Sequence, residues 1–137
     1  AAIECVAQWH DTFPDSCVTL GNHDRLPGRK ANTAGIPTRW IRAYEDVLET
    51  PSWDFVLRTV IDGVQYIHGE GVTARTQALR DMQSTVQGHR HTECYVEWKV
   101  GAEKRVFGMQ LGVGLDKDKS CGIIIDGEFA ANEMMPL

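Results

Sequence analysis

The segment 53–71, WDFVLRTVIDGVQYIHGEG, constrains the fold more strongly than any other part of the chain. It contains two runs of β-branched and aromatic residues on either side of Asp62-Gly63, a dipeptide that favours the two-residue turn of a β-hairpin. The second run ends at His68, where nearby glycines allow the chain to turn sharply. The segment therefore predicts a hairpin whose second strand ends at a histidine.

Helical and strand-like patterns alternate along the rest of the chain. Apolar residues at helical spacing predict helices over residues 1–13, 38–49 and 74–83. Short β-rich runs predict strands over residues 16–20, 84–91, 93–100, 105–114 and 121–125. Thr38, behind Pro37, is the expected cap of the second helix, and the turn-rich residues 25–37 are expected to form a loop. We expect the run 121–125 to close the sheet of an α/β fold.

Composition indicates one soluble domain spanning residues 1–137. The chain is 42% hydrophobic, and none of its apolar runs approaches the roughly 18 residues of a membrane span. A net charge of −5 argues against a surface built mainly for nucleic acid, although the run HDRLPGRK is locally basic. No signal peptide or Cys-x-x-C pair is present, so we expect a reduced, cytoplasmic protein with buried thiols. The four tryptophans are expected to be core or interface aromatics.

Four of the five histidines follow predicted strands, at glycine-bearing turns. Ligands of open α/β sheets bind in the loops beyond the carboxyl ends of strands, so this placement suits a site. Imidazole is the commonest neutral ligand of first-row transition metals. The histidines concerned are His23, His68, His89 and His91. Together they predict a metal site, although any one of them alone would more often be an ordinary packed side chain, as we expect of His10.

Three motifs occur in a fixed order at the predicted strand ends: GNHD at 21–24, YIHGEG at 66–71 and GHRH at 88–91. This set resembles the second half of the calcineurin-like metallophosphoesterases, whose pattern is D-x-H, G-D-x-x-D, G-N-H-[DE], H and G-H-x-H. The segments GIPTRWI, VQGHRH and FGMQLGVG are also similar to the branch encoded by phages and prophages. The resemblance implies a four-layer sandwich of two mixed β-sheets flanked by helices.

The resemblance also implies an activity and a set of roles. The family hydrolyses phosphomonoesters or phosphodiesters with a hydroxide activated by two divalent ions, here Mn, Fe, Zn or Ni. Asn22, His68 and His89 would bind one ion and His91 the other. His23 would act as general acid toward the leaving oxygen, and its neighbour Asp24 would orient the imidazole. Apart from the resemblance, Arg25, Arg29 and Lys30 lie just past the motif and could contact the substrate phosphate, although a solvated basic loop is the more common outcome for such a run.

The upstream part of the family pattern is missing. The D-x-H and G-D-x-x-D motifs should precede Gly21, where the acidic residues and His10 stand in a different pattern. Those motifs would supply the carboxylate ligands, so the remaining donors are all neutral. We therefore expect this chain to be the partial domain of a longer protein, without the N-terminal βαβ portion, and to bind at most one ion weakly.

Two classes of function follow from these expectations. The first is a metal-dependent phosphoesterase in the cytoplasm of a bacterium, or of its host cell if a phage encodes it. The second is a catalytically incompetent relative that binds metal, a partner protein or nucleic acid. The sequence leaves the phosphate ester unspecified, with nucleic acid among the candidate substrates, and it leaves homo-oligomerisation open. No membrane partner is expected.

Overall fold

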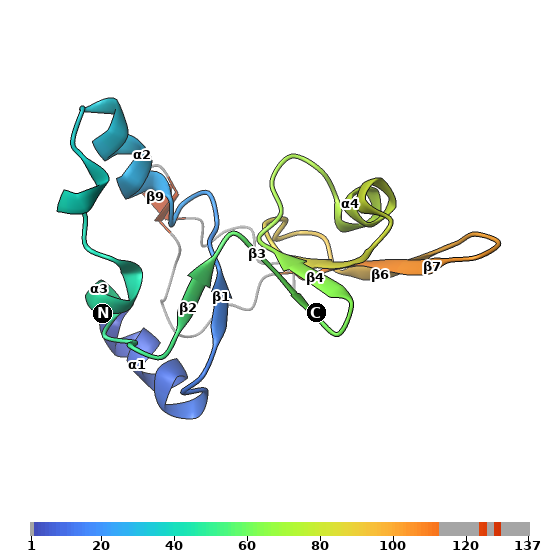
Figure 1. Ribbon diagram of the computed structural model, residues 1–137, viewed down its shortest axis with the longest axis horizontal. Helices are drawn as coiled ribbons and strands as arrows, with labels where there is room; N and C mark the ends of the chain where they lie inside the picture. Colours follow the sequence, from blue (N-terminus) through green and yellow to red (C-terminus); the bar gives the residue numbers. More distant parts are fainter. Residues whose placement is uncertain (1, 113–123, 126–127, 130–137) are drawn as a thin grey trace. The chain divides into compact units, whose positions relative to one another are not determined.

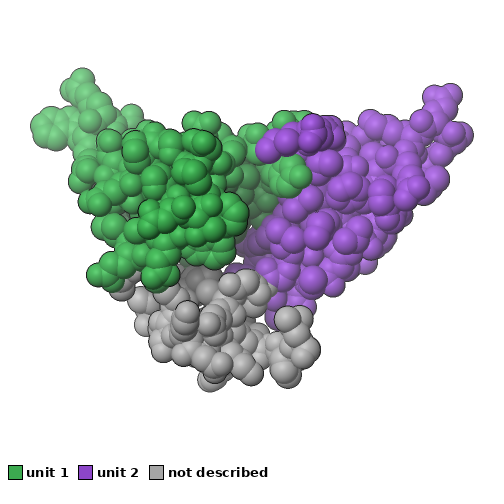
Figure 2. All heavy atoms as spheres, turned by 90° about the horizontal axis from the view of Figure 1, so that it is seen from below, with its two compact units in different colours: residues 1–60, 66–68 green, residues 61–65, 69–137 purple. Residues whose placement is uncertain are grey.

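The computed structural model describes residues 2–112, 124–125 and 128–129 and shows a mixed α/β chain (Figure 1). The chain divides into two units, shown in separate colours in Figure 2. Unit 1 comprises Ala1–Val60 and Tyr66–His68, and unit 2 comprises Ile61–Gln65 and Gly69–Leu137. None of the helices in the described ranges has the length and apolar character needed to cross a membrane.

Unit 1 is built around a pair of short parallel strands. Strands β1 (Cys17–Thr19) and β2 (Asp54–Val56) pair with Cys17 opposite Asp54. The predicted helix at the start of the chain is α1 (Ala2–Thr12), and the predicted strand that follows it is β1. The link between the two strands carries the helices α2 (Leu26–Thr33), η1 (Thr38–Trp40) and α3 (Tyr44–Leu48).

The expectation of a loop over residues 25–37 is wrong, because α2 occupies most of it. Pro27 and Gly28 suggested a turn, but Pro27 lies in the first helical turn, where a missing N–H costs nothing. The helix ends before Gly35, whose φ of +71° suits glycine. The predicted break is thus confined to the end of the segment.

The single helix expected over residues 38–49 is also wrong. The chain forms the 3₁₀ turn η1, becomes extended at Ile41 and starts a new helix, α3, at Tyr44. Thr38 is part of η1 and its side chain does not cap it. The break lets Tyr44 stack on Phe55, with ring centroids 5.4 Å apart. This tertiary contact is invisible to local helical periodicity.

The predicted hairpin is confirmed. Strands β3 (Arg58–Ile61) and β4 (Val64–Ile67) flank Asp62 and Gly63, whose φ angles are +51° and +77°. The first β-rich run is split at Leu57, because β2 pairs with β1 whereas β3 belongs to a five-stranded sheet. The strand order of this mixed sheet is β3-β4-β5-β7-β6.

Unit 2 packs one helix on the strands β5 (Ser84–Gln87), β6 (Tyr95–Val100) and β7 (Arg105–Gln110). The helix α4 (Ala74–Asp81) and these strands all match predicted elements. β5 and β7 are parallel, and β6 and β7 are antiparallel. Ala74 and Ala78 are fully buried, and the strand residues buried with them are mostly polar: Gln65, Thr85, Gln87 and Gln110.

Several expectations about individual side chains are corrected. Cys17 and Cys94 are exposed rather than buried. Trp9, Trp40 and Trp98 are also exposed, so they are not core residues. The strand expected over 121–125 is described only at β8 (Ile124–Ile125), which pairs with β9 (Glu128–Phe129) in a separate sheet and does not close the five-stranded one. The remaining residues of that run, with Cys121, lie outside the described ranges.

Candidate metal and phosphate site

The GNHD motif forms a tight turn directly after β1. Strand pairing continues to Leu20, whose N–H donates to the Val56 carbonyl at 2.7 Å. The Gly21 N–H then donates to Asp24 Oδ2 at 2.8 Å, and the Arg25 N–H donates to the Gly21 carbonyl at 3.2 Å. The Asp24 carboxylate therefore stabilises the turn by accepting a hydrogen bond from the backbone of Gly21, as short acidic side chains commonly do.

Gly21 lies against the imidazole of His68. A Cβ atom placed on Gly21 would be 2.6 Å from His68 Cε1 and 2.7 Å from His68 Nδ1, closer than real contacts allow. His68 arrives at this position from the end of β4, 47 residues further along the chain. The glycine of the motif is thus needed for close approach of the histidine, and its backbone φ is not the reason.

Asn22 and His68 meet in the same place. His68 Nε2 and Asn22 Oδ1 are 3.0 Å apart and part-buried, which is a hydrogen-bond distance when the imidazole carries its hydrogen on Nε2. Two donor atoms bound about 90° apart on one ion, at bond lengths of about 2.1 Å, would also be about 3.0 Å apart. The structure therefore brings together two of the predicted ligands at a spacing that suits a shared divalent ion. Both donors are neutral, so they supply no charge to offset the cation.

His23 and Asp24 are exposed on the same turn. No hydrogen bond joins their side chains in the part of the chain that the structure describes, where the Asp24 carboxylate is bound by the Gly21 N–H instead. The orienting role of Asp24 toward His23 remains a prediction. Asp24 also accepts a hydrogen bond through its backbone carbonyl, from the Tyr44 hydroxyl. The pKa of Tyr44 is raised by burial and, second, by the Asp24 carboxylate, with Arg25 opposing.

Two arginine side chains donate hydrogen bonds to backbone carbonyls of this turn. Arg25 Nε donates to the Gly21 carbonyl at 3.2 Å, and the Arg29 guanidinium donates to the Asn22 carbonyl at 2.9 Å. A guanidinium has five N–H donors, so Arg29 has further donors besides the one that bonds to the Asn22 carbonyl. The predicted phosphate contact Arg25 therefore lies beside the motif, and Arg29 is a second cation in the same place.

The remaining predicted ligands belong to unit 2. His89 is exposed, with a left-handed φ of +71°, and His91 is half-buried. Between them in sequence, the Arg90 guanidinium forms an ion pair with Glu93 at 2.9 Å. The backbone N–H of Arg90 donates to the Gly88 carbonyl, also at 2.9 Å. The four predicted ligands are thus divided, with Asn22 and His68 in unit 1 and the GHRH pair in unit 2.

A pair of glutamines holds the GHRH turn, and sequence reasoning missed both. The Gln110 amide donates to the Gly88 carbonyl, and the Gln87 amide donates to Gln110 Oε1 at 3.1 Å and to the Val72 carbonyl at 2.8 Å. Both side chains are buried. The signal in the sequence was that each glutamine is the last residue of a strand, Gln87 of β5 and Gln110 of β7. Strand alternation shows which side chains share a face of the sheet, but it does not show which face is buried under a helix.

The fifth histidine, His10, has a different environment. His10 bonds to the Ser52 hydroxyl at 3.2 Å and packs near Trp53, in agreement with its interpretation as an ordinary side chain. No group of three or more His, Cys, Asp or Glu side chains within the described ranges is arranged to hold a metal ion. Asn22, which would bind through an amide oxygen, is outside those residue types.

Comparisons with known proteins give no family for this chain. A scan against protein-family models, a search of curated proteins and a search of solved structures each found no significant match. The residues of the site therefore carry the functional proposal by themselves.

Proposed function

We propose that the chain belongs to a metal-dependent phosphoesterase of the calcineurin-like type, with the four-layer sandwich of that family. One observation supports this most directly: Asn22 Oδ1 and His68 Nε2 are 3.0 Å apart, although the two residues are distant in sequence. Gly21 adds to it, because a Cβ at this position would force the His68 imidazole to shift.

Each residue has a part in this proposal. Asn22 and His68 would hold one divalent ion, with Mn, Fe, Zn or Ni as candidates, and the ligand roles of His89 and His91 in unit 2 stay predictions. When bound, such ions neutralise charge on the phosphoryl group and lower the pKa of water. His23 is exposed beside the Asn22 donor and can give a proton to the leaving oxygen. Arg25 and Arg29 place positive charge at the same turn.

A binding module without catalysis is the second candidate. The neutrality of the donor pair favours it, because neutral amide and imidazole ligands bind hard divalent ions weakly. The only carboxylate on the turn, Asp24, is already bound to a backbone N–H. The two candidates differ in whether the His23 imidazole donates a proton to a leaving oxygen.

Turnover separates them. The purified protein is assayed with p-nitrophenyl phosphate and bis(p-nitrophenyl) phosphate in the presence of each of the four metals. The proposal predicts metal-dependent hydrolysis, with kcat about 10²–10⁴-fold lower in His23→Ala. His10→Ala is the matched control, since His10 lies on α1 and bonds to Ser52. Absence of turnover with every metal, or unchanged kcat in His23→Ala, contradicts the enzyme and leaves the binding module.

A further inference from the structure

The link between β1 and β2 carries a concentration of positive charge. Residues 25–42 hold five of the 14 Lys and Arg residues and none of the 19 Asp and Glu residues, in a chain whose net charge is −5. Arg29 and Lys30 lie on α2, and Arg39 and Trp40 lie on η1. These four residues define the α2–η1 surface.

The turn after α2 brings its two parts together. The Ile36 N–H donates to the Ala31 carbonyl at 2.9 Å, the left-handed Gly35 reverses the chain, and Pro37 starts η1. As a result, α2 and η1 contact each other. Arg29 and Arg39, which are ten residues apart in sequence, thus lie on two neighbouring elements.

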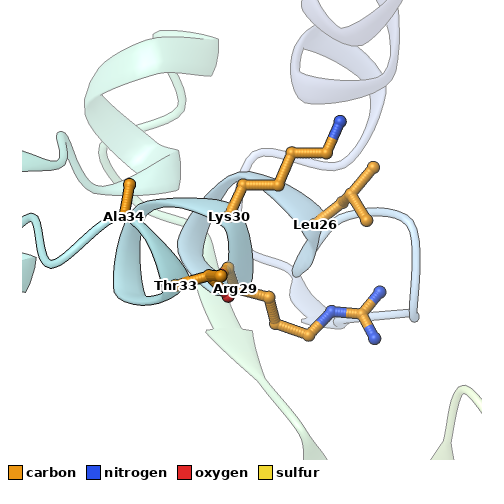
Figure 3. A pocket seen from close by; sticks show the side chains of 5 residues that line it. All are labelled: Leu26, Arg29, Lys30, Thr33 and Ala34. Atoms are coloured by element: carbon orange, nitrogen blue, oxygen red, sulfur yellow. The ribbon is translucent and has the colours of Figure 1, made fainter.

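The cations of the α2–η1 surface face solvent. Arg29, Lys30 and Arg39 are exposed, and none of them has a carboxylate partner within the described ranges. Figure 3 shows Arg29 and Lys30 leaving α2 in different directions, with Leu26 between them, around an open hollow that Thr33 and Ala34 also line. Diverging cations over an apolar floor suit an extended polyanion better than a single small phosphate.

Trp40 adds a different kind of contact. Its side chain is 75% exposed, and it stands between Arg39 and Arg42 in sequence. A large exposed indole flanked by cations offers a stacking face to an unpaired base. Arg42 marks the border of the surface, because its guanidinium donates to the Asp46 carbonyl of the acidic helix α3.

The α2–η1 surface is tied to the GNHD turn. The Arg29 guanidinium donates to the Asn22 carbonyl at 2.9 Å, so one cation belongs to both places. A phosphodiester bound by Arg29 would therefore lie beside the backbone of the GNHD turn. The contact gives a reason for the basic surface to adjoin the candidate phosphate site.

We propose that the α2–η1 surface binds single-stranded nucleic acid and presents its phosphodiester to the GNHD turn, an inference that rests on the proposed phosphoesterase function. Water would add across the ester: the bond from phosphorus to the leaving oxygen breaks, and a bond to the water oxygen forms. The leaving oxygen takes a proton and departs as an alcohol. The other product is a strand ending in a phosphomonoester.

Single strands fit better than the alternatives. Duplex DNA presents phosphates but keeps its bases stacked, which leaves Trp40 without a partner. Anionic lipid surfaces attract basic helices whose opposite face is strongly apolar, whereas α2 has no buried residue and a polar sequence, LPGRKANT.

Binding is measured by fluorescence anisotropy of labelled oligo(dT) and oligo(U), with EDTA present to prevent metal-dependent hydrolysis. Double replacement Arg29→Gln/Lys30→Gln is expected to weaken affinity at low salt and to reduce the slope of log K against log salt by about 0.7 for each lost phosphate contact. Arg80→Gln/Lys104→Gln, at exposed cations of unit 2, is the matched control and should leave both unchanged.

The stacking contribution is tested separately. Trp40→Ala is expected to weaken oligonucleotide binding about fivefold or more, without changing the salt slope. Trp9→Ala is the control, because Trp9 is also largely exposed but lies on α1. A loss of equal size in both variants overturns the assignment of the stacking face.

Four outcomes are distinguished. Binding that depends on the α2–η1 residues supports the inference. Turnover of small esters without such binding overturns the inference and leaves the phosphoesterase intact. Oligonucleotide binding without turnover of any ester supports the surface and contradicts the enzyme. Equal or tighter binding to phosphatidylserine vesicles, lost in the same variants, overturns nucleic acid as the ligand.

Discussion

His68 Nε2 lies 3.0 Å from Asn22 Oδ1, and the backbone of Gly21 lies against the same imidazole. Three residues from two separate segments are therefore locked into one small arrangement. The close approach has a cost, because it leaves no room for any side chain at position 21. A substitution at position 21 can therefore disturb the arrangement without changing Asn22 or His68.

Gly21→Ala should disrupt the site through packing alone. The added methyl would lie 2.6 Å from His68 Cε1, so the imidazole must shift, which we expect to disturb its contact with Asn22. We expect a loss of about 1–3 kcal/mol in the free energy of unfolding, measured with urea, together with weaker metal binding.

Gly28→Ala is the matched control for that substitution. Nothing lies within 4 Å of a Cβ at Gly28, and this glycine is inside α2. Alanine should therefore stabilise the helix by about 0.5–1 kcal/mol and leave metal binding unchanged. Equal effects of the two substitutions would show that Gly21 has no special role.

Gly108→Ala should destabilise unit 2. A Cβ there would lie 2.5 Å from the carbonyl carbon and oxygen of Ala74, so α4 would have to lift from β7. Backbone cannot rotate away as a side chain can, and we expect a loss of at least about 1–3 kcal/mol in urea unfolding. Gly101→Ala, whose Cβ would meet the Lys104 carbonyl at an ordinary 3.6 Å, should change stability by less than about 1 kcal/mol.

Gln110→Met should loosen the GHRH turn. The Gln110 side chain bonds to the Gly88 carbonyl and to the Ala74 N–H, the latter at 3.2 Å, and methionine satisfies neither. We expect a stability loss of about 1–3 kcal/mol and faster amide exchange at Ala74. Gln77→Met, which removes a more exposed bond to Asp81, should cost only a few tenths of a kcal/mol. Unchanged exchange at Ala74 would contradict the anchoring role.

Tyr44 should make the protein less stable at high pH. Its pKa in the folded state is raised above the ordinary 10.0 by burial and by the Asp24 carboxylate, so the folded chain holds this proton more tightly than the unfolded chain. The resulting stability is fully present below pH 10.0 and is lost as the pH rises through the folded pKa.

The measurement is the ultraviolet titration of tyrosinate in the wild type and in Tyr44→Phe. The difference between the two curves isolates Tyr44, and its midpoint should lie above pH 10.0. A midpoint at or below that value would contradict the burial of the hydroxyl. Over the same pH range, the urea midpoint of the wild type should fall relative to that of Tyr44→Phe.

The elements with local signals could be predicted from the sequence. The Asp62-Gly63 hairpin, the helix α4 and the strands around the GHRH turn have their information within a few neighbouring residues. Helix α2 was missed because the same Pro-Gly pair suits a turn and a first helical turn alike. The break between η1 and α3 accompanies the packing of Tyr44 on Phe55, which no local pattern reveals.

The candidate site was predictable in its residues and not in its contacts. Motif order singled out Asn22 and His68, but their meeting depends on the tertiary folding of unit 1, to which both residues belong. The glutamine pair that holds Gly88 was missed because strand alternation does not fix which face a helix covers. In unit 2, the buried strand residues include the polar Thr85, Gln87 and Gln110 beside the apolar Val106.

Titration of Mn²⁺, followed by the loss of the free-ion electron paramagnetic resonance signal, tests the central claim most directly. If Asn22 and His68 share one divalent ion, the wild type binds Mn²⁺, and Asn22→Ala and His68→Ala each weaken binding by at least about tenfold, while His10→Ala does not. Equal Mn²⁺ affinity in all four proteins, or no binding by the wild type, would contradict the shared site.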